Sequence, residues 1–315
     1  MQRRSFFGAV FSGLAGAASA QPPKPKAGGI PVRELGRTGQ KLTCIGMGGG
    51  RFHLIPFAEG TAMVRRAYDL GITYFDMARG YYKGHAEEVY GAVIPEFRKN
   101  IFLTSKSGNR TRAGAEADLD LSLKTMHTDH LDLWQMHSVG KQEDIDKILG
   151  PGGALEAFVA AKKAGKVRFF GFTGHADPAI NLKLLRSYDG FDTMLMPLHV
   201  SDSFFLSFEK NALPPAVERG IGVLGMKIFG SAYLLRTFSV EDCLSYTLNL
   251  PVSAVPLGFT TPGQLEDDVR IAQKFKPLSS EAVEALRARA HADIDVMGGP
   301  VAHGPAVEFW KQKQN

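Results

Sequence analysis

Cysteine is scarce in this sequence, and no cysteine motif is present. The 315 residues include two cysteines, Cys44 and Cys243, which are nearly two hundred positions apart. Because no Cys-x-x-Cys pair occurs, the sequence excludes a zinc ribbon and an iron–sulfur cluster held by cysteines. Two distant cysteines define no disulfide framework, so we expect two buried free thiols.

A strong charge of one sign is also missing. Charged residues make up 22% of the chain, and the formal net charge is +5. No Lys/Arg-rich run interleaved with aromatic residues occurs, which argues against a nucleic-acid partner. None of the nine histidines forms a His-x-His pair, so we expect no metal site and disfavour a metal-dependent hydrolase.

The N-terminus lacks an apolar run long enough to span a membrane, although it has the parts of an export signal. Arg3 and Arg4 precede Phe6-Phe7 and an uncharged, Ala/Gly-rich stretch that ends in Ala18-Ser19-Ala20. A transmembrane helix needs ~20 apolar residues, so we expect no stable membrane anchor. The paired arginines resemble a twin-arginine signal, which predicts export of the folded protein to the periplasm by the twin-arginine machinery.

The sequence therefore divides into three parts. Residues 1–20 are the expected signal peptide, and the proline- and glycine-rich residues 21–31 are the expected linker. Residues 32–315 are the expected folded domain, because no second linker or charge block interrupts them. With 44% hydrophobic residues, the chain can bury one large core.

Within the folded part, short apolar segments alternate with longer amphipathic segments. The eight expected strands are Leu42–Met47, Thr73–Asp76, Ile101–Ser105, Leu131–Gln135, Val167–Phe172, Thr193–Met196, Gly222–Met226 and Ser253–Leu257. The expected helices among them are Thr61–Leu70, Ala86–Ile94, Ala115–Met126, Gly153–Ala164, Ala179–Ser187, Pro214–Arg219, Val240–Leu248 and Pro262–Gln273. An amphipathic pattern over Ser279–Ala290 adds a C-terminal helical tail.

This alternation predicts an α/β fold, a single (β/α)8 TIM barrel whose active site lies at the carboxyl ends of the strands. The alternative, a doubly wound open sheet, would require a Gly-x-Gly-x-x-Gly turn after the first strand. The turn here is Gly46-Met47-Gly48-Gly49-Gly50, which lacks that spacing. Its glycines would instead let the backbone approach a ligand closely.

Polar residues gather at the ends of three neighbouring strands. Asp76, Lys106 and His137 end the second, third and fourth expected strands, and Tyr81 follows Asp76 in the same loop. A tyrosine phenol, whose usual pKa is about 10, donates a proton near neutral pH only when its anion is stabilised. Lys106 would stabilise that anion, Asp76 would fix the ammonium, and His137 would bind a substrate carbonyl. Since none of these groups supplies hydride, a bound nicotinamide is expected beside them.

Three motifs give the sequence a resemblance to the aldo/keto reductase superfamily. Val32–Gly39 is similar to the opening β-hairpin of that family, Tyr74–Gly91 to its catalytic signature, and Asp132–His137 to the strand that carries its histidine. The resemblance spans residues 32–275. It implies that Tyr81 is the general acid and that NADPH is the usual reductant. The implied catalytic tetrad is Asp76, Tyr81, Lys106 and His137.

The resemblance is weaker at the positions that would hold the cofactor. Thr173 stands where a serine of a Ser-Asn pair is usual, Leu195 where a glutamine would help, Met226-Lys227 where Tyr-Ser is common, and Gln264 where NADP-selective members often have arginine. NADP is the expected cofactor, with NAD as the alternative. The expected cofactor-binding residues are Gly48, Thr173, Met226, Lys227, Gly258, Thr260, Gln264 and Asp268.

The sequence leaves alternatives for the proton donor, for the residues of the substrate pocket and for the function. Tyr82 stands where the family commonly has glycine, which makes it a rival to Tyr81. Phe52, His53 and Trp134 are candidates for an apolar wall around a small carbonyl or hydroxyl substrate, although the place of Trp134 on a strand favours the core, and His53 is equally well a surface loop residue. The alternative function is an exported barrel that holds nicotinamide as a binding or sensing element with little turnover. For the enzyme, export in the folded state predicts a tightly held cofactor that one substrate reduces and another oxidises.

Overall fold

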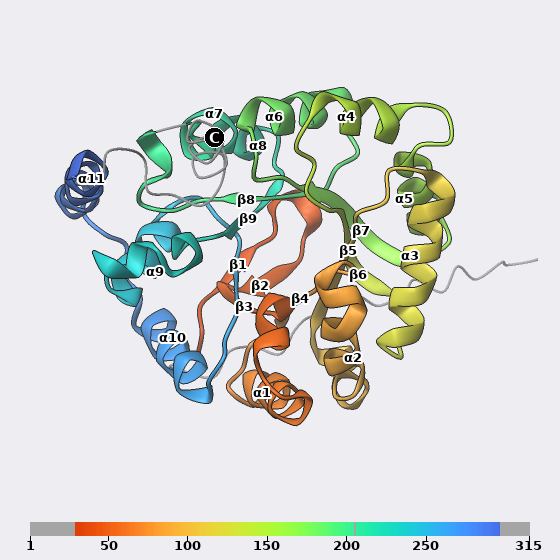
Figure 1. Ribbon diagram of the computed structural model, residues 1–315, viewed down its shortest axis with the longest axis horizontal. Helices are drawn as coiled ribbons and strands as arrows, with labels where there is room; N and C mark the ends of the chain where they lie inside the picture. Colours follow the sequence, from red (N-terminus) through yellow and green to blue (C-terminus); the bar gives the residue numbers. More distant parts are fainter. Residues whose placement is uncertain (1–28, 205, 297–315) are drawn as a thin grey trace, which may run out of the picture.

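The computed structural model describes residues 29–204 and 206–296, and within them eight parallel strands form one barrel (Figure 1). The strands are β3 (Ile45–Gly48), β4 (Tyr74–Asp76), β5 (Phe102–Ser107), β6 (Leu131–Met136), β7 (Val167–Thr173), β8 (Thr193–Pro197), β9 (Gly222–Met226) and β10 (Val255–Leu257). All eight expected strands are present. The signal peptide, most of the linker and the end of the C-terminal tail lie outside the described residues.

The ring of strands closes between its last member and its first. Each strand from β3 to β9 pairs in parallel with its neighbours along the chain, and β10 returns to pair with β3, where Val255 lies opposite Ile45. Between β9 and β10, a parallel bridge from Leu224 to Ala254 completes the ring. The prediction of a (β/α)8 barrel is therefore confirmed.

Helices surround the barrel on its outside (Figure 1). They are α1 (Phe57–Asp69), α2 (His85–Gly91), α3 (Arg112–Thr125), α4 (Gln142–Leu149), α5 (Ala154–Lys163), α6 (Pro178–Ser187), α7 (Phe208–Asn211), α8 (Leu213–Glu218), α9 (Val240–Asn249), α10 (Pro262–Lys274) and α11 (Ser280–Val296). Thr111, Asp177, Ser239 and Thr261 precede α3, α6, α9 and α10, and each side chain accepts a hydrogen bond from a backbone N–H of the first turn. Such caps fix where these helices begin.

An antiparallel hairpin of β1 (Val32–Glu34) and β2 (Lys41–Thr43) precedes the barrel. Its second strand corrects one prediction, because the expected strand Leu42–Met47 is divided at Cys44 between β2 and β3. The backbone N–H of Cys44 donates to the carbonyl oxygen of Pro31 at 2.7 Å, whereas its carbonyl oxygen accepts from the backbone N–H of Val255 of β10 at 3.0 Å, so Cys44 links the hairpin to the barrel. The chain changes direction there.

The hairpin supplies the floor of the barrel interior. Leu35 and Leu42 are fully buried. They form one cluster with inward-facing residues of the strands, namely Tyr74, Phe102, Leu133, Leu195, Leu224 and Ala254. Burying a leucine side chain is worth roughly 1.5–3 kcal/mol, so this contact fixes the hairpin against the barrel. In the described part of the chain, a site inside the barrel therefore opens at the other end, where the strands have their carboxyl termini.

A larger apolar layer lies between the strands and the helices. Both cysteines are buried and free, as the sequence predicts. Trp134 is 1% exposed and stacks on Phe158 with 3.6 Å between the ring centres, and Phe52 is also 1% exposed. Both side chains therefore fill the core and do not line a substrate pocket, which for Trp134 confirms the core position expected from its place on a strand.

A polar network holds the C-terminal helix α11 on the barrel. Arg287 of α11 donates to Glu209 of α7 at 2.5 Å and to the hydroxyl of Tyr246 of α9 at 3.1 Å. Tyr246 in turn donates to Glu209 at 2.8 Å. The expected helical tail is therefore present, and it extends to Val296.

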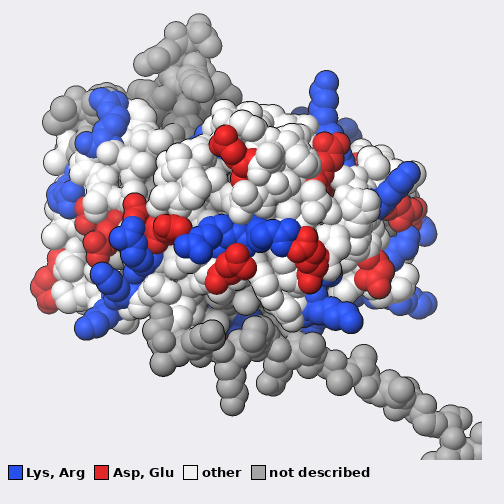
Figure 2. Space-filling view, turned by 90° about the horizontal axis from the view of Figure 1, so that it is seen from below, with Lys and Arg blue, Asp and Glu red and all other residues white. Residues whose placement is uncertain are grey.

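Basic and acidic side chains are interspersed on the surface, as Figure 2 shows for one face of the molecule. Arg65 of α1 pairs with Glu96, and Arg66 pairs with Glu266 of α10. No helix in the described ranges is long and apolar enough to cross a membrane. In the same part of the chain, no group of three or more His, Cys, Asp or Glu side chains is arranged to hold a metal ion.

Candidate active site

The ends of three neighbouring strands bring four polar residues together at the mouth of the barrel. Asp76 is the last residue of β4, Lys106 lies one residue before the end of β5, and His137 directly follows β6. Tyr81 begins the short 3-10 helix η3 (Tyr81–Gly84) in the loop after β4. The structure therefore brings together the four residues that the sequence predicts as catalytic.

Lys106 and Asp76 form a buried ion pair. The Nζ atom of Lys106 lies 2.6 Å from Oδ2 of Asp76. The other carboxylate oxygen, Oδ1, accepts hydrogen bonds from the hydroxyls of Tyr74 at 3.1 Å and Thr104 at 2.9 Å. Burial alone would lower the pKa of Lys106, but Asp76 and Tyr81 beside it raise that pKa above its usual value. Lys106 is therefore held as a cation.

Tyr81 lies against this ion pair and against His137. The Nζ atom of Lys106 is 5.4 Å from the centre of the Tyr81 ring, and the His137 ring meets it edge-on with 5.5 Å between the centres. Burial raises the pKa of Tyr81, while the positive charge of Lys106 opposes part of that rise. The phenol is therefore protonated at neutral pH and has a cation close by to stabilise its anion.

The His137 side chain is an uncharged imidazole. Burial lowers its pKa to about 3, and the positive charge of Lys106 acts in the same direction. A neutral imidazole donates one hydrogen bond and accepts another. His137 can therefore bind a carbonyl oxygen without adding a second positive charge to the site.

The rival tyrosine, Tyr82, lies outside this cluster. Its side chain is 47% exposed and stacks on His53 with 3.5 Å between the ring centres. Its backbone has φ +51°, in the left-handed region that favours glycine, the residue common at this position in the resembling family. The geometry thus favours Tyr81 as the proton donor over Tyr82.

A second buried ion pair fixes the loop that carries Tyr81. Arg79 donates to Glu87 at 2.5 Å and to the carbonyl oxygen of Lys83 at 3.0 Å, so it ties the loop to α2 and spans η3. Glu87 is fully buried and also accepts a hydrogen bond from Ser105 of β5 at 2.6 Å. A Cβ atom on Gly84 would lie 1.3 Å from Nη2 of Arg79, so only glycine at that position leaves room for the guanidinium.

A cavity of about 990 Å³ opens beside Tyr81 and Asp76. This is the upper end of the range of roughly 300–1,000 Å³ that ligand pockets span. Seven of the eight expected cofactor-binding residues line the cavity, namely Gly48, Met226, Lys227, Gly258, Thr260, Gln264 and Asp268. It also contains Arg51, Phe229 and Phe259, which the sequence analysis does not identify. Arg51 could have been noticed as a cation directly after a glycine-rich turn.

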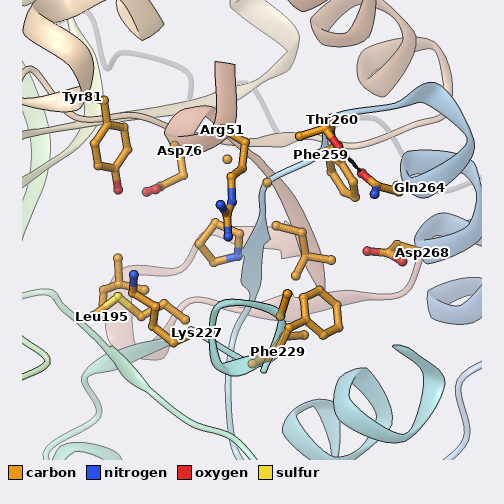
Figure 3. Close-up of a pocket in the computed structure, with 18 of the residues that line it drawn as sticks. Arg51, Asp76, Tyr81, Leu195, Lys227, Phe229, Phe259, Thr260, Gln264 and Asp268 are labelled. Carbon is orange, nitrogen blue, oxygen red and sulfur yellow. Dashed lines mark hydrogen bonds between the residues drawn. The ribbon is translucent and has the colours of Figure 1, made fainter. Parts of the chain in front are cut away.

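The cavity has two distinct ends, which Figure 3 shows. The residues at one end are Tyr81, Asp76 and Leu195, and those at the other end are Thr260, Gln264 and Asp268. Arg51 projects into the space between them, and Lys227 lies beside Leu195, toward the Tyr81 end. Neither side chain has a hydrogen-bond or ion-pair partner in the described part of the chain. Burial lowers the pKa of Lys227, and the charge of Arg51 lowers it further, so an anion is favoured between these two cations.

Two glycines shape the wall around Arg51. A Cβ atom on Gly258 would lie 2.7 Å from Cγ of Arg51, and one on Gly48 would lie 3.1 Å from the carbonyl oxygen of Leu257. Glycine at 258 therefore lets the Arg51 side chain lie across the end of β10. The expectation that the glycines after the first strand let the backbone approach a ligand closely stays a prediction.

Thr173 is the expected cofactor residue that the structure does not bring into the cavity wall. It ends β7, is 1% exposed, and its Oγ1 accepts a hydrogen bond from the backbone N–H of Ser138 at 2.8 Å. Its hydroxyl proton is available to donate a hydrogen bond to a ligand. Its assignment to the carboxamide of a nicotinamide stays a prediction.

The cavity fits an elongated ligand with an anionic centre. Arg51 lies at its middle, and Lys227 lies between Arg51 and the end with the proton donor. Donors and acceptors lie at the other end. A nicotinamide dinucleotide has this order of groups, with a pyrophosphate between two nucleosides. The residues present therefore fit such a cofactor.

Comparison with known proteins agrees with this fold. The model of the aldo/keto reductase family matches residues 44–242. The uncharacterized oxidoreductase YqkF of Bacillus subtilis is 32% identical over an aligned length of 285, and the alignment covers 75% of this chain and 89% of YqkF. The aldo-keto reductase yakc of Schizosaccharomyces pombe, named for NADP(+), is 33% identical over an aligned length of 162, and the alignment covers 46% of this chain and 45% of yakc.

Solved structures show the same fold. The holo form of aldo-keto reductase AKR11C1 from Bacillus halodurans superimposes with a TM-score of 0.71, covering 82% of this chain and 96% of that one at 21% identity. The family match covers more than half of the chain, and the similarity to YqkF extends over most of its length. This chain therefore belongs to the aldo/keto reductase family and is an oxidoreductase that acts on carbonyl or alcohol groups.

Proposed function

We propose that this protein reduces an aldehyde or ketone to an alcohol, or catalyses the reverse reaction, with a nicotinamide dinucleotide bound in the cavity. The observation that carries the proposal is the position of Tyr81, a protonated phenol between the Lys106 ammonium and the neutral His137 imidazole. A carbonyl oxygen placed there meets one proton donor and one neutral hydrogen-bond donor.

Each of the four residues has one task in the proposed reaction. Tyr81 gives its proton to the carbonyl oxygen as that oxygen becomes an alkoxide. Lys106 stabilises the phenolate that remains, and Asp76 holds the Lys106 ammonium in place. His137 donates a hydrogen bond to the same oxygen and orients the substrate. In the reverse direction Tyr81 accepts the proton of the alcohol.

The cavity residues would bind the cofactor. Arg51 and Lys227 suit the pyrophosphate, and Thr173 suits the carboxamide beside the catalytic end. Thr260 and Gln264 lie at the start of α10, where the helix dipole adds positive potential. When bound in reduced form, the nicotinamide supplies the hydride. The family resemblance favours NADP, and NAD is the alternative.

A substrate screen with two matched variants tests the proposal. Purified protein is assayed with aldehydes and ketones, and with alcohols in reverse, by following the absorbance of reduced nicotinamide. Tyr81→Phe is expected to lower the rate by about 10²–10⁴ with cofactor binding kept, while Tyr82→Phe keeps most activity. Full turnover by Tyr81→Phe would refute the assignment of the proton donor. Tight nicotinamide binding without turnover in the whole screen would instead favour the binding or sensing role.

We also propose that the protein works after export. The support is the sequence of residues 1–20, with Arg3-Arg4 before an uncharged stretch. Export in the folded state would allow the cofactor to be loaded beforehand. A cofactor that stays bound through dialysis in stoichiometric amount would support recycling by a second substrate, whereas weak and freely exchanging cofactor would contradict it.

A further inference from the structure

The end of the cavity opposite Tyr81 contains a carboxylate without a partner. Asp268 of α10 is 5% exposed, and its side chain points into the cavity (Figure 3). In residues 29–204 and 206–296, no group donates a hydrogen bond to this carboxylate and no cation pairs with it. Burial alone raises its pKa, to about 7. A buried carboxylate without a partner is costly, so this position calls for a ligand that donates hydrogen bonds.

Gln264 is the neighbour of Asp268 one turn earlier on the same helix. Its Oε1 accepts hydrogen bonds from the backbone N–H of Thr260 at 2.9 Å and from the Thr260 hydroxyl at 3.0 Å. Because a backbone N–H can only donate, the atom that faces it must be the amide oxygen. The amide NH2 group of Gln264 therefore faces away from Thr260 and is left to donate to a ligand.

The cations of the cavity lie away from this end. Three basic residues line the cavity, namely Arg51, Lys83 and Lys227. Lys83 is in η3, two residues after Tyr81. Arg51 acts on the pKa of Lys227, whereas no charged group acts on that of Asp268. On the outer side of α10, Arg270 pairs with Asp267, so it is already engaged.

We propose that this end of the cavity binds an adenosine without a 2′-phosphate, so that the protein prefers NAD(H) to NADP(H), and that Asp268 and Gln264 determine this preference. A ribose hydroxyl both donates and accepts hydrogen bonds, which matches a carboxylate beside an amide NH2. A phosphate only accepts and is negative, so Asp268 repels it. The inference rests on the proposed function for the orientation of the cofactor, and it departs from the NADP that the family resemblance favours.

Binding measurements without catalysis test this inference. The full chain is dialysed extensively and titrated at pH 8 by calorimetry with ADP-ribose and with 2′-phospho-ADP-ribose, which lack the nicotinamide ring. NADH and NADPH are titrated in parallel by fluorescence. ADP-ribose and NADH are expected to bind more tightly than their 2′-phosphorylated counterparts by at least about 10-fold. Equal or tighter binding of the phosphorylated ligands by the wild type would overturn the proposal.

Two variants test whether Asp268 and Gln264 determine the preference for NAD(H) over NADP(H). Asp268→Asn removes the charge with almost no change in shape and is expected to narrow the preference by about 10-fold. Adding Gln264→Arg to Asp268→Asn is expected to reverse it. Asp267→Asn, the adjacent but exposed carboxylate, is the matched control and should keep the wild-type ratio. A thermal unfolding transition like that of the wild type would show that Asp268→Asn is folded. If this folded variant kept the wild-type ratio of affinities for the unphosphorylated and 2′-phosphorylated ligands, the role of Asp268 would be refuted.

The outcomes also separate this inference from the proposed function. Preferential binding of NADH without reduction of any carbonyl would refute the function and keep the inference. Carbonyl reduction with a preference for NADPH would keep the function and refute the inference.

Discussion

The Nζ atom of Lys106 lies 2.6 Å from Oδ2 of Asp76, and both side chains are almost completely buried. Removing one partner of such a pair leaves the other charge buried and uncompensated. Asp76→Asn is therefore expected to lower the free energy of unfolding by about 3 kcal/mol, measured by urea denaturation, and to reduce carbonyl reduction strongly.

The double variant Asp76→Asn, Lys106→Met is the control for this prediction. It removes both charges, so most of the lost stability should return while activity stays low. If Asp76→Asn were as stable as the wild type, Lys106 could not be the buried cation that the geometry indicates.

The Arg79–Glu87 pair makes a separate prediction for the loop that holds Tyr81. In Arg79→Met, the fully buried Glu87 loses its cation and the loop loses its tie across η3. We expect the free energy of unfolding to fall by about 3 kcal/mol. We also expect kcat to fall by about 10-fold with cofactor Kd nearly unchanged, because Tyr81 is displaced while the cavity is kept.

Arg65 provides the matched control for Arg79. It pairs with Glu96 on the surface, where both side chains are about half exposed. Arg65→Met should change stability by no more than about 1 kcal/mol and leave kcat unaltered. Similar losses in both variants would mean that the effect of Arg79 is not specific to the loop.

The buried carboxyl of Asp268 predicts a pH dependence of stability. Its pKa is raised from 3.8 to about 7 in the folded protein, so between these values the folded state binds more protons than the unfolded state. Stability is thus lost as the pH rises through this window. From about pH 5 to pH 8, the wild type should lose about 2 kcal/mol relative to Asp268→Asn in chemical denaturation without cofactor. A constant difference between the two proteins would contradict the raised pKa.

The paired arginines predict export by the twin-arginine pathway. Changing Arg3 and Arg4 to lysine should leave the precursor in the cytoplasm of a host with the twin-arginine pathway, as measured by cell fractionation. Changing Lys24 and Lys26 of the linker to arginine should leave export intact. Normal export of the Arg3→Lys, Arg4→Lys variant would argue for ordinary secretion of an unfolded chain.

The sequence predicts the barrel well because its strands are short apolar runs that alternate with helices, and each is buried on both faces. It does not predict the break between β2 and β3 at Cys44. The two strands form one continuous apolar pattern in the sequence, and their division depends on a hydrogen bond to Pro31. It also misses α4, of whose eight residues only Ile145 and Ile148 are buried. The predicted pattern assigns one helix to each strand, and α5 already fills that place after β6.

For the site, strand ends were the informative feature. Asp76, Lys106 and His137 meet because parallel strands end at one edge, which can be read from their positions in the sequence. The position of Arg51 beside Lys227 is different. It depends on the path of a loop and on space left by Gly258, which no local pattern encodes. For the same reason, the isolation of Asp268 became visible only in three dimensions.

The hairpin at the base of the barrel also affects the order in which cofactor and substrate bind and leave. Because Leu35 and Leu42 close one end of the barrel interior, the described part of the chain leaves the other end as the opening that cofactor and substrate share. A dinucleotide bound along the cavity would fill the space between this opening and Tyr81, so we would expect the cofactor to bind before the substrate and the product to leave before the cofactor. An inhibitor bound at this opening would then exclude the substrate and also slow the release of the cofactor. Its inhibition would be stronger for a cofactor that dissociates more slowly.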